Sequence, residues 1–226
     1  MVIKEPFTTE SPIIANYDYN DIINGTGVEE FDLAIVSGAT TTNIITPETL
    51  IYSTEIETSH YYDTAPTTTV VKCLDEDFDL TEFTTPRDIK GTGLVSFSWH
   101  LSSGAAPLST TYIKIIFTKV SGATETEVGN GRGISVSGGI AGGNYNTTET
   151  IPLSLNDTHF AAGDILRVTI QSWTGRADGS APFPEVNTTI AHDPQNRDGA
   201  IIIPSTDTDP ITITKNKIWI PFKLNQ

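Results

Sequence analysis

Three aspartates alternate along one acidic stretch, at Asp75, Asp77 and Asp79. Carboxylates at this spacing open the EF-hand calcium loop, which also needs glycine at its sixth position and a bidentate glutamate at its twelfth. Leu80 occupies the sixth position and Pro86 the twelfth, so the calcium motif fails. On a β-strand the three carboxylates lie on one face. The spacing therefore predicts a solvated strand face rather than a metal site.

A second group of ionisable residues lies in the segment HDPQNRDG, from His192 to Gly199. A catalytic triad would also need a positioned nucleophile, and the sequence has no nucleophile-elbow pattern. Metal ligation would need another histidine or cysteine at a suitable spacing, but His60, His100 and His159 are scattered along the chain. The segment is interpreted as a loop held by aspartate and arginine hydrogen bonds. No catalytic, cofactor or metal site is expected anywhere in the chain.

A third group consists of aromatic side chains that are not in phase with the strand residues expected to face the core. Trp99 shares the phase of Val95 and Phe97 and is expected in the core, whereas two other tryptophans are out of phase with their apolar neighbours. Exposed tryptophan and tyrosine can stack on sugar rings or lie in a subunit interface, and both interpretations stay open. The expected contact residues are Tyr17, Tyr19, Tyr61, Tyr62, Trp173 and Trp219.

The clearest structural element is the stretch NDTHFAAGDILRVTIQSW, from Asn156 to Trp173. Turn-forming residues (Asn156, Asp157 and Gly163) punctuate its start. From Leu166 to Gln171 the residues alternate: the apolar ones are Leu166, Val168 and Ile170, and the polar ones are Arg167, Thr169 and Gln171. This period of two predicts a strand with one buried and one wet face.

The rest of the chain repeats the same alternation. The strongest further strands are expected at Ile89–Leu101, Tyr112–Val120, Thr148–Leu155 and Ile218–Leu224, and shorter ones at 31–36, 50–57, 68–73, 125–128, 185–191 and 200–203. The glycine-rich stretch Gly129–Gly143 is expected to be a long loop around one short strand, and His60–Asp63 another loop. About nine to eleven strands are counted, and no segment has the helical period of 3.6.

This pattern predicts an all-β protein, an antiparallel β-sandwich of the jelly-roll type. Residues 1–30 are expected to be an extended N-terminal arm and residues 31–226 a single domain. An edge strand of the same domain is the alternative for the arm. An immunoglobulin-like sandwich is the second choice of fold. It is less favoured than the jelly roll because the chain is long for such a domain and lacks its paired cysteines.

Charge and composition narrow the expected partners. The chain has 226 residues, a formal net charge of -15 and a pI near 4.4, so it should repel phosphate backbones, and nucleic acid is not an expected partner. No apolar run is long enough to span a bilayer, and the N-terminus does not have the pattern of a signal peptide. Cys73 is the single cysteine, and a buried structural thiol is expected there.

Seven short motifs are distributed along the chain: K-E-P-F, Y-D-Y-x-D-I, P-x-x-I-K-G-x-G, H-F-x-x-G-D-x-L-R, H-D-P-x-N-R-D-G, I-P-S-T-D and I-P-F-K. They lie at Lys4–Phe7, Tyr17–Ile22, Pro86–Gly93, His159–Arg167, His192–Gly199, Pro204–Asp207 and Pro221–Lys223. In this order the motifs resemble a group of virion-associated structural proteins from tailed viruses of environmental origin. The resemblance spans nearly the whole chain and brings no catalytic residue with it.

The resemblance implies a structural protein of the virion, assembled in the host cytoplasm, that decorates or cements the capsid exterior. Its partners would be capsid proteins and further copies of itself, for example in a trimer. The alternative is a carbohydrate- or receptor-binding module in a spike or fibre head, with Trp173 or Tyr61 and Tyr62 stacking on sugars. An enzyme such as a glycoside hydrolase would need two facing carboxylates in a cleft, and nothing in the sequence points to such a pair.

Overall fold

The structure is a computed structural model, and it describes residues 15–16, 26–36, 42–46, 56–61, 70–103, 108–133, 136–137, 144–176, 186–191, 200–201, 211–212 and 217–223. The strands are β1 (Ala15–Asn16), β2 (Thr26–Val36), β3 (Thr42–Thr46), β4 (Ile56–Tyr61), β5 (Val71–Leu80), β6 (Arg87–Ser103), β7 (Leu108–Ser121), β8 (Thr124–Arg132), β9 (Val136–Ser137), β10 (Asn144–Phe160), β11 (Ile165–Arg176), β12 (Val186–Ala191), β13 (Ala200–Ile201), β14 (Ile211–Thr212) and β15 (Lys217–Lys223). The protein is all-β, as the alternation predicts. Within these ranges no helix occurs, and none could therefore cross a membrane.

One hydrogen-bonded sheet of 13 strands makes up most of the described fold. Its order is β4-β12-β6-β15-β2-β3-β5-β11-β7-β8, with β1 on β2, β10 on β6 and β9 on β7, while β13 and β14 pair separately. The sheet is mixed rather than purely antiparallel, because β3 runs parallel to β5. A parallel neighbour needs a long crossover, which is supplied here by the chain between β3 and β5 as it passes through β4.

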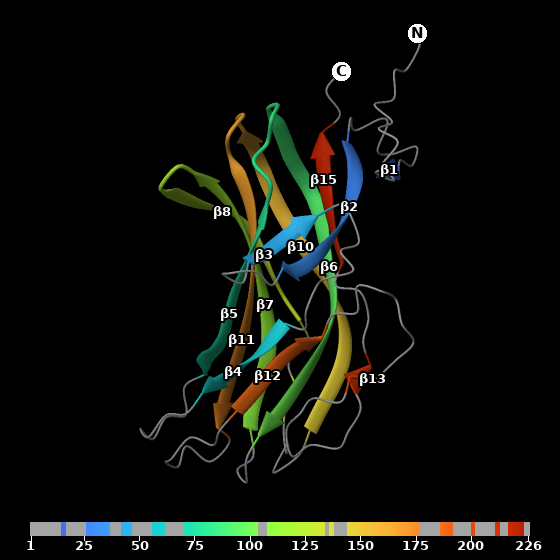
Figure 1. Cartoon of the computed structure of the whole chain (residues 1–226), viewed down its shortest axis with the longest axis vertical. Coiled ribbons are helices and arrows are strands. Elements are labelled where there is room, and N and C mark those ends of the chain that lie inside the picture. Colours follow the sequence, from blue (N-terminus) through green and yellow to red (C-terminus); the bar gives the residue numbers. More distant parts are fainter. Residues whose placement is uncertain are drawn as a thin grey trace.

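The long strands β6, β7, β10 and β11 run along the longest axis of the molecule (Figure 1). β6 is the central member, with 17 residues. One edge of β6 pairs with β10 along nearly its whole length. Its other edge pairs first with β15 and then with β12. This single strand therefore links the two halves of the sheet.

The sheet curls until its last strand, β8, returns to β10, and the fold is nearly a closed barrel. Two glycines of β8 allow the approach: a Cβ on Gly129 would lie 2.4 Å from the Ser154 carbonyl oxygen, and one on Gly131 would lie 2.6 Å from the Pro152 carbonyl oxygen. Real Cβ atoms do not come so close to backbone oxygens. The expectation of a loop from Gly129 was wrong for Gly129–Arg132, because these glycines remove side chains between two strands instead of forming turns.

The core lies inside the curled sheet. It contains the alternate apolar residues that the sequence pattern predicts, and the largest fully buried side chains include Trp99, Phe78, Phe97, Phe117 and Phe160. The inward row of β11 (Leu166, Val168 and Ile170) is fully buried as well. Cys73 is 6% exposed, and burial raises the pKa of its thiol to about 12, which confirms the expectation of a buried structural thiol.

Two further expectations about boundaries were wrong. Asn156 and Asp157 lie within β10, at a register shift between Leu155 and Thr158, because a β-bulge accommodates turn-forming residues without ending the strand. The turn lies at residues 161–164, where Gly163, the third of the expected turn-forming residues, has a φ of 89°. His60 and Tyr61 end β4 rather than lying in a loop, because their backbones pair with β12.

The first strand is longer than expected. Residues 26–30, assigned to the arm, belong to β2 because they pair with β15. β3 was not predicted at all, since TNIIT has only two apolar residues and no clear alternation. Residues 1–14 and 17–25 lie outside the described residues, and so does the expected loop from His192 to Gly199.

Candidate functional site

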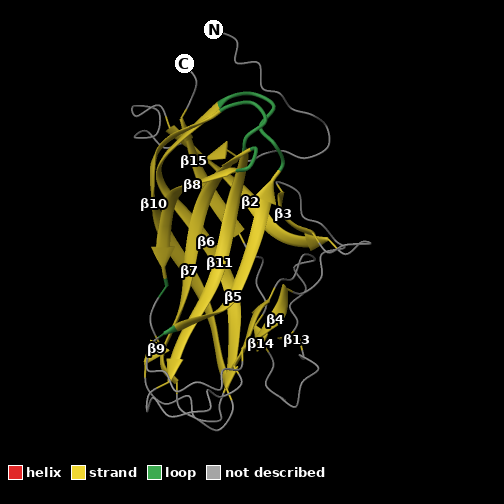
Figure 2. Ribbon diagram, turned by 90° about the vertical axis from the view of Figure 1, so that its left-hand side faces the viewer, coloured by secondary structure: helices red, strands yellow, loops and turns green. Residues whose placement is uncertain are grey.

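The exposed surface of four neighbouring strands, β5, β11, β7 and β8, carries the best candidate site. Figure 2 shows β5, β11 and β7 side by side along the body. A shallow depression of about 350 Å³ on this surface is lined by Asp75, Asp77, Ile116, Thr118, Glu125, Glu127, Thr169 and Gln171. We call this surface the acidic face. Its only apolar lining residue is Ile116, so it is a polar contact surface rather than an apolar groove.

Strand register explains why these side chains meet. Gln171 pairs with Asp75 and Thr169 with Asp77 across β11 and β5. Alternate residues of a strand share one face, so the polar residues of all four strands gather outside while their apolar partners enter the core. The predicted solvated row of aspartates is confirmed: Asp75 and Asp77 are exposed and Asp79 is half-buried.

Arg167 is a cation among the carboxylates of the acidic face. Its Nε and Nη2 donate to Asp79 Oδ1 and Oδ2 at 2.7 and 2.8 Å, and its Nη1 donates to Glu125 Oε1 at 2.7 Å. Asp77 Oδ2 lies 3.4 Å from Nη1. The hydrogen bonds that the guanidinium donates to Asp79, followed by the charges of Asp79, Asp77 and Glu125, raise the pKa of Arg167 further above its ordinary value. The surface therefore holds a guanidinium between three carboxylates.

The remaining carboxylates are oriented by neighbouring side chains. Thr169 Oγ1 donates to Asp77 Oδ1 at 2.6 Å, and Gln171 Nε2 donates to Asp75 Oδ1 at 3.0 Å. Asn130 Nδ2 donates to Glu127 Oε1 at 2.6 Å. Such contacts reduce the number of conformations the carboxylates can adopt before a partner arrives.

Aromatic rings border the acidic face. Trp173 Nε1 donates to Gln171 Oε1 at 3.1 Å, which joins the indole to the polar row. The Trp173 and Tyr112 rings are stacked, with centroids 6.4 Å apart and planes 6° apart. The Arg132 guanidinium carbon lies 3.5 Å from the centroid of the Tyr112 ring. Trp173 was predicted as a contact residue, but Tyr112 and Arg132 were missed, although Tyr112 has the outward phase next to Ile113.

Trp219, another predicted contact residue, does not lie beside Trp173. Trp219 lies on β15, half-buried, and its Nε1 donates to Glu30 Oε2 at 2.9 Å, while Lys217 also pairs with Glu30. The backbone of Tyr61 ends β4, but its side chain lies outside the described residues, as do Tyr17, Tyr19 and Tyr62.

Three of the motif segments that carry the family resemblance meet at one end of the sheet. His159 pairs with Asp88 and Phe160 with Arg87 across β10 and β6. Phe222 of β15 pairs with Ile89 of β6. The segments at 86–93, 159–167 and 221–223 are therefore neighbours in space.

Their side chains have structural roles there. Phe83 contacts the Phe160 and Phe222 rings edge-on, with centroids 5.2 and 6.1 Å away. The Phe83 carbonyl accepts from Gly163 N at 2.8 Å, and the Asp164 carboxylate accepts from Ala161 N at 2.7 Å and pairs with Lys119 at 2.9 Å. These residues of the motifs thus stabilise a packed turn at this end of the sheet.

A search of the described residues finds no group of three or more histidine, cysteine, aspartate or glutamate side chains placed to hold a metal ion. The acidic face presents oriented carboxylate acceptors, the hydroxyls of Thr118 and Thr169, the Gln171 amide and an adjacent aromatic edge.

Comparison with known proteins does not assign the chain to a family. No protein-family model matches the chain, and no curated protein sequence is significantly similar to it. Among solved structures, an alpha-amino acid ester hydrolase is 13% identical with a TM-score of 0.48, covering 84% of this chain and 36% of its own. The chain thus spans about a third of the length of that hydrolase.

Two other solved structures have similarly weak likeness. An aminopeptidase from the marine sediment archaeon Thaumarchaeota archaeon is 12% identical with a TM-score of 0.45, covering 85% of this chain and 36% of its own. The structure of infectious bursal disease virus, Gx strain, is 10% identical with a TM-score of 0.25, covering 92% of this chain and 53% of its own. Scores this low carry no argument about function.

Proposed function

We propose that the protein is a structural protein of a virus particle, located on the capsid exterior, where it decorates or cements the capsid through contacts with capsid proteins and with further copies of itself. It acts by binding and not as an enzyme. In this proposal the curled sheet is the framework of a jelly-roll-like sandwich that includes the whole of β2, and residues before β2 form an arm that contacts neighbouring subunits.

The acidic face is the observation that carries the proposal. Four carboxylates surround a shallow depression of about 350 Å³ on a broad sheet surface. A shallow, polar surface with oriented acceptors suits contact with another macromolecule better than it suits the enclosure of a small substrate. The net charge of -15 supports an exterior position, because it opposes contact with packaged nucleic acid.

Co-sedimentation tests this proposal. Purified protein is mixed with particles from which it has been removed, and Glu127→Lys is compared with Glu82→Lys. Both residues are exposed and both changes add the same charge, but Glu82 lies in the loop between β5 and β6, outside the acidic face. We expect Glu127→Lys to reduce binding to the particles and Glu82→Lys to retain it. Equal binding of the two variants would contradict a role for the acidic face.

A second candidate function is glycan binding, favoured by the stacked Trp173 and Tyr112 rings next to the hydrogen-bonding side chains of Gln171 and Asp75. Aromatic faces and polar side chains together are what sugar recognition requires. A glycan array of the purified protein separates the candidates, with Trp173→Ala as the test variant and Trp219→Ala as the control. Binding that is lost only in Trp173→Ala would favour this function over capsid decoration.

A further inference from the structure

The sheet surface that carries the acidic face changes the sign of its charge along the strands. Alternate residues of β11 face outward, and each marks a row that crosses the sheet. These residues are Arg167, Thr169, Gln171 and Trp173. In the rows of Arg167 and Thr169, register adds carboxylates from both sides: Asp79 and Asp77 from β5, and Glu127 from β8. This part of the surface is therefore negative around one arginine.

The next two rows carry positive charge. Lys114 of β7 pairs in register with Gln171 on one side and with Arg132 of β8 on the other. Lys72 of β5 belongs to the last row. We call Lys72, Lys114 and Arg132 the basic patch. Asp75, the register partner of Gln171, lies at the border between the basic patch and the rest of the acidic face.

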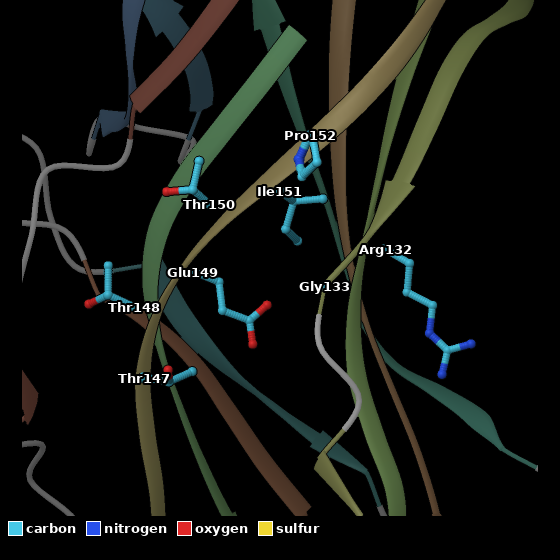
Figure 3. Close-up of a pocket in the computed structure, with 8 residues that line it drawn as sticks. All are labelled: Arg132, Gly133, Thr147, Thr148, Glu149, Thr150, Ile151 and Pro152. Atoms are coloured by element: carbon cyan, nitrogen blue, oxygen red, sulfur yellow. The ribbon is translucent and has the colours of Figure 1, made fainter. Parts of the chain in front are cut away.

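A stack of aromatic and guanidinium groups lies within the basic patch. Trp173 and Tyr112 are register partners with rings parallel to within 6°, and the Arg132 guanidinium carbon lies 3.5 Å from the Tyr112 ring centroid. Figure 3 shows the Arg132 side chain pointing away from Glu149, which is buried. Tryptophan, tyrosine and arginine are enriched where protein interfaces bind most strongly, and groups already held in one conformation lose little entropy on binding.

Lys114 supplies a positive charge that is open to a partner. Its side chain is half-buried, between the strands that carry Gln171 and Arg132. Within the described part of the chain the Lys114 ammonium has no ion pair. Lys72, by contrast, is exposed and pairs with Asp75, three residues further along β5.

We propose that two copies of the chain pair through this surface, with the acidic face of each copy against the basic patch of the other. A twofold axis in the contact plane, crossing the strands between the rows of Thr169 and Gln171, reverses the order of the rows. The negative rows of one copy then lie over the positive rows of its partner, so the surface is complementary to itself. Pairing of this kind rests on the proposed contacts between copies, and it identifies the surface that makes them.

Local charge outweighs net charge at such a contact. Arg167 and Trp173 are six residues apart on one strand, which is about 20 Å at roughly 3.3 Å per residue. Salt screens exposed charges over about 8 Å at physiological ionic strength. The acidic face therefore does not neutralise the basic patch, and the net charge of -15 acts only weakly between the bodies of two molecules. Charges in direct contact then select the orientation in which opposite signs meet.

Two charge-reversed variants of the full chain test the pairing. Lys72→Glu with Lys114→Glu makes the whole surface negative, and Asp77→Lys with Glu127→Lys makes its acidic part positive. Sedimentation equilibrium over a range of concentrations measures the mass. The unmodified protein should form a dimer, and each variant alone should associate about tenfold more weakly or less, because like charges meet. An equimolar mixture of the two variants should associate nearly as well as the unmodified protein, since each reversed charge then meets its opposite.

The mixture also guards against misfolding, because only folded variants can restore association. Glu82→Lys, outside this surface, should associate as the unmodified protein does. A mass of one chain at every concentration of the unmodified protein would overturn the inference. So would a mixture that associates no better than its components.

The outcome is separable from that of the co-sedimentation experiment, because sedimentation equilibrium uses the purified chain alone. A pair of copies attaches to a particle at two points, so loss of pairing also weakens binding to the particle. A chain that stays monomeric and still binds particles through the acidic face would overturn the pairing while the capsid proposal stands. That result would assign this surface to a capsid protein instead of a second copy.

Discussion

Arg167 and Asp79 form a two-point ion pair across β11 and β5, with donor–acceptor distances of 2.7 and 2.8 Å. The two residues are also direct register partners in the sheet. The pair therefore joins the two strands by side chains as well as by their backbones.

A double-mutant cycle measures this pair. The Arg167 side chain is 23% exposed and the Asp79 side chain 36%, so solvent screens the interaction in part, and we expect a coupling free energy of about 1 kcal/mol. The variants are Arg167→Ala, Asp79→Ala and their combination, compared by urea unfolding. The control cycle is Arg87 with Glu29, 3.8 Å apart, where we expect less than about 0.5 kcal/mol. Equal couplings in the two cycles would contradict the special role of the two-point geometry.

The turn at Asp164 should make stability depend on pH. Hydrogen bonds from Lys119, Ser121 and Ala161 lower the pKa of the Asp164 carboxyl to about 2, whereas unfolded aspartate has a pKa of about 3.9. Because the folded pKa is the lower one, the stabilisation is complete above pH 4 and is lost as pH falls through 2. The free energy of unfolding of Asp164→Asn, measured with urea between pH 4 and pH 2, should change less with pH than that of the unmodified protein. An identical slope in both proteins would exclude this contribution.

Cys73 should be unreactive in the folded protein. Burial raises the pKa of its thiol to about 12, so almost no thiolate is present near neutral pH, and the side chain is 6% exposed. We expect Ellman's reagent to modify no thiol in buffer and one thiol per chain in guanidinium chloride. Rapid modification in buffer would show that β5 opens readily at Cys73, where the register between β5 and β11 shifts.

The approach of β8 to β10 predicts that Gly131→Ala is destabilising. Its Cβ would lie 2.6 Å from the Pro152 carbonyl oxygen and 2.9 Å from Ile151 Cγ2, so the strands must separate, at a cost of about 1–3 kcal/mol. Thr126→Ala, at an exposed position of the same strand, should change the free energy of unfolding by less than about 0.5 kcal/mol. Unfolding of both variants in urea compares them, and a neutral Gly131→Ala would show that the two strands do not pack this closely.

These glycines also show where sequence reasoning stops. Alternation correctly predicted the buried rows through Phe97 and Leu166, because period-2 burial is a local property of a strand. Gly129 and Gly131 were interpreted as loop residues, since the sequence does not reveal that another strand lies against them. Asn156 and Asp157 were interpreted as turn residues, although a bulge accommodates them within β10.

The site residues were predictable to a similar degree. The outward phase of Asp75, Asp77 and Trp173 follows from strand periodicity alone. Their meeting with Glu125 and Glu127 depends on strand order, which links positions 50 residues apart and cannot be read from local pattern.

The central claim is that the protein lies on the outside of a virus particle. Gold-labelled antibodies raised against the purified chain, applied to intact and to disrupted particles and viewed by electron microscopy, test it most directly. We predict gold on the surface of intact particles, at regularly spaced positions. Labelling only after disruption, or no labelling of particles in which mass spectrometry also fails to find the chain, would contradict the claim.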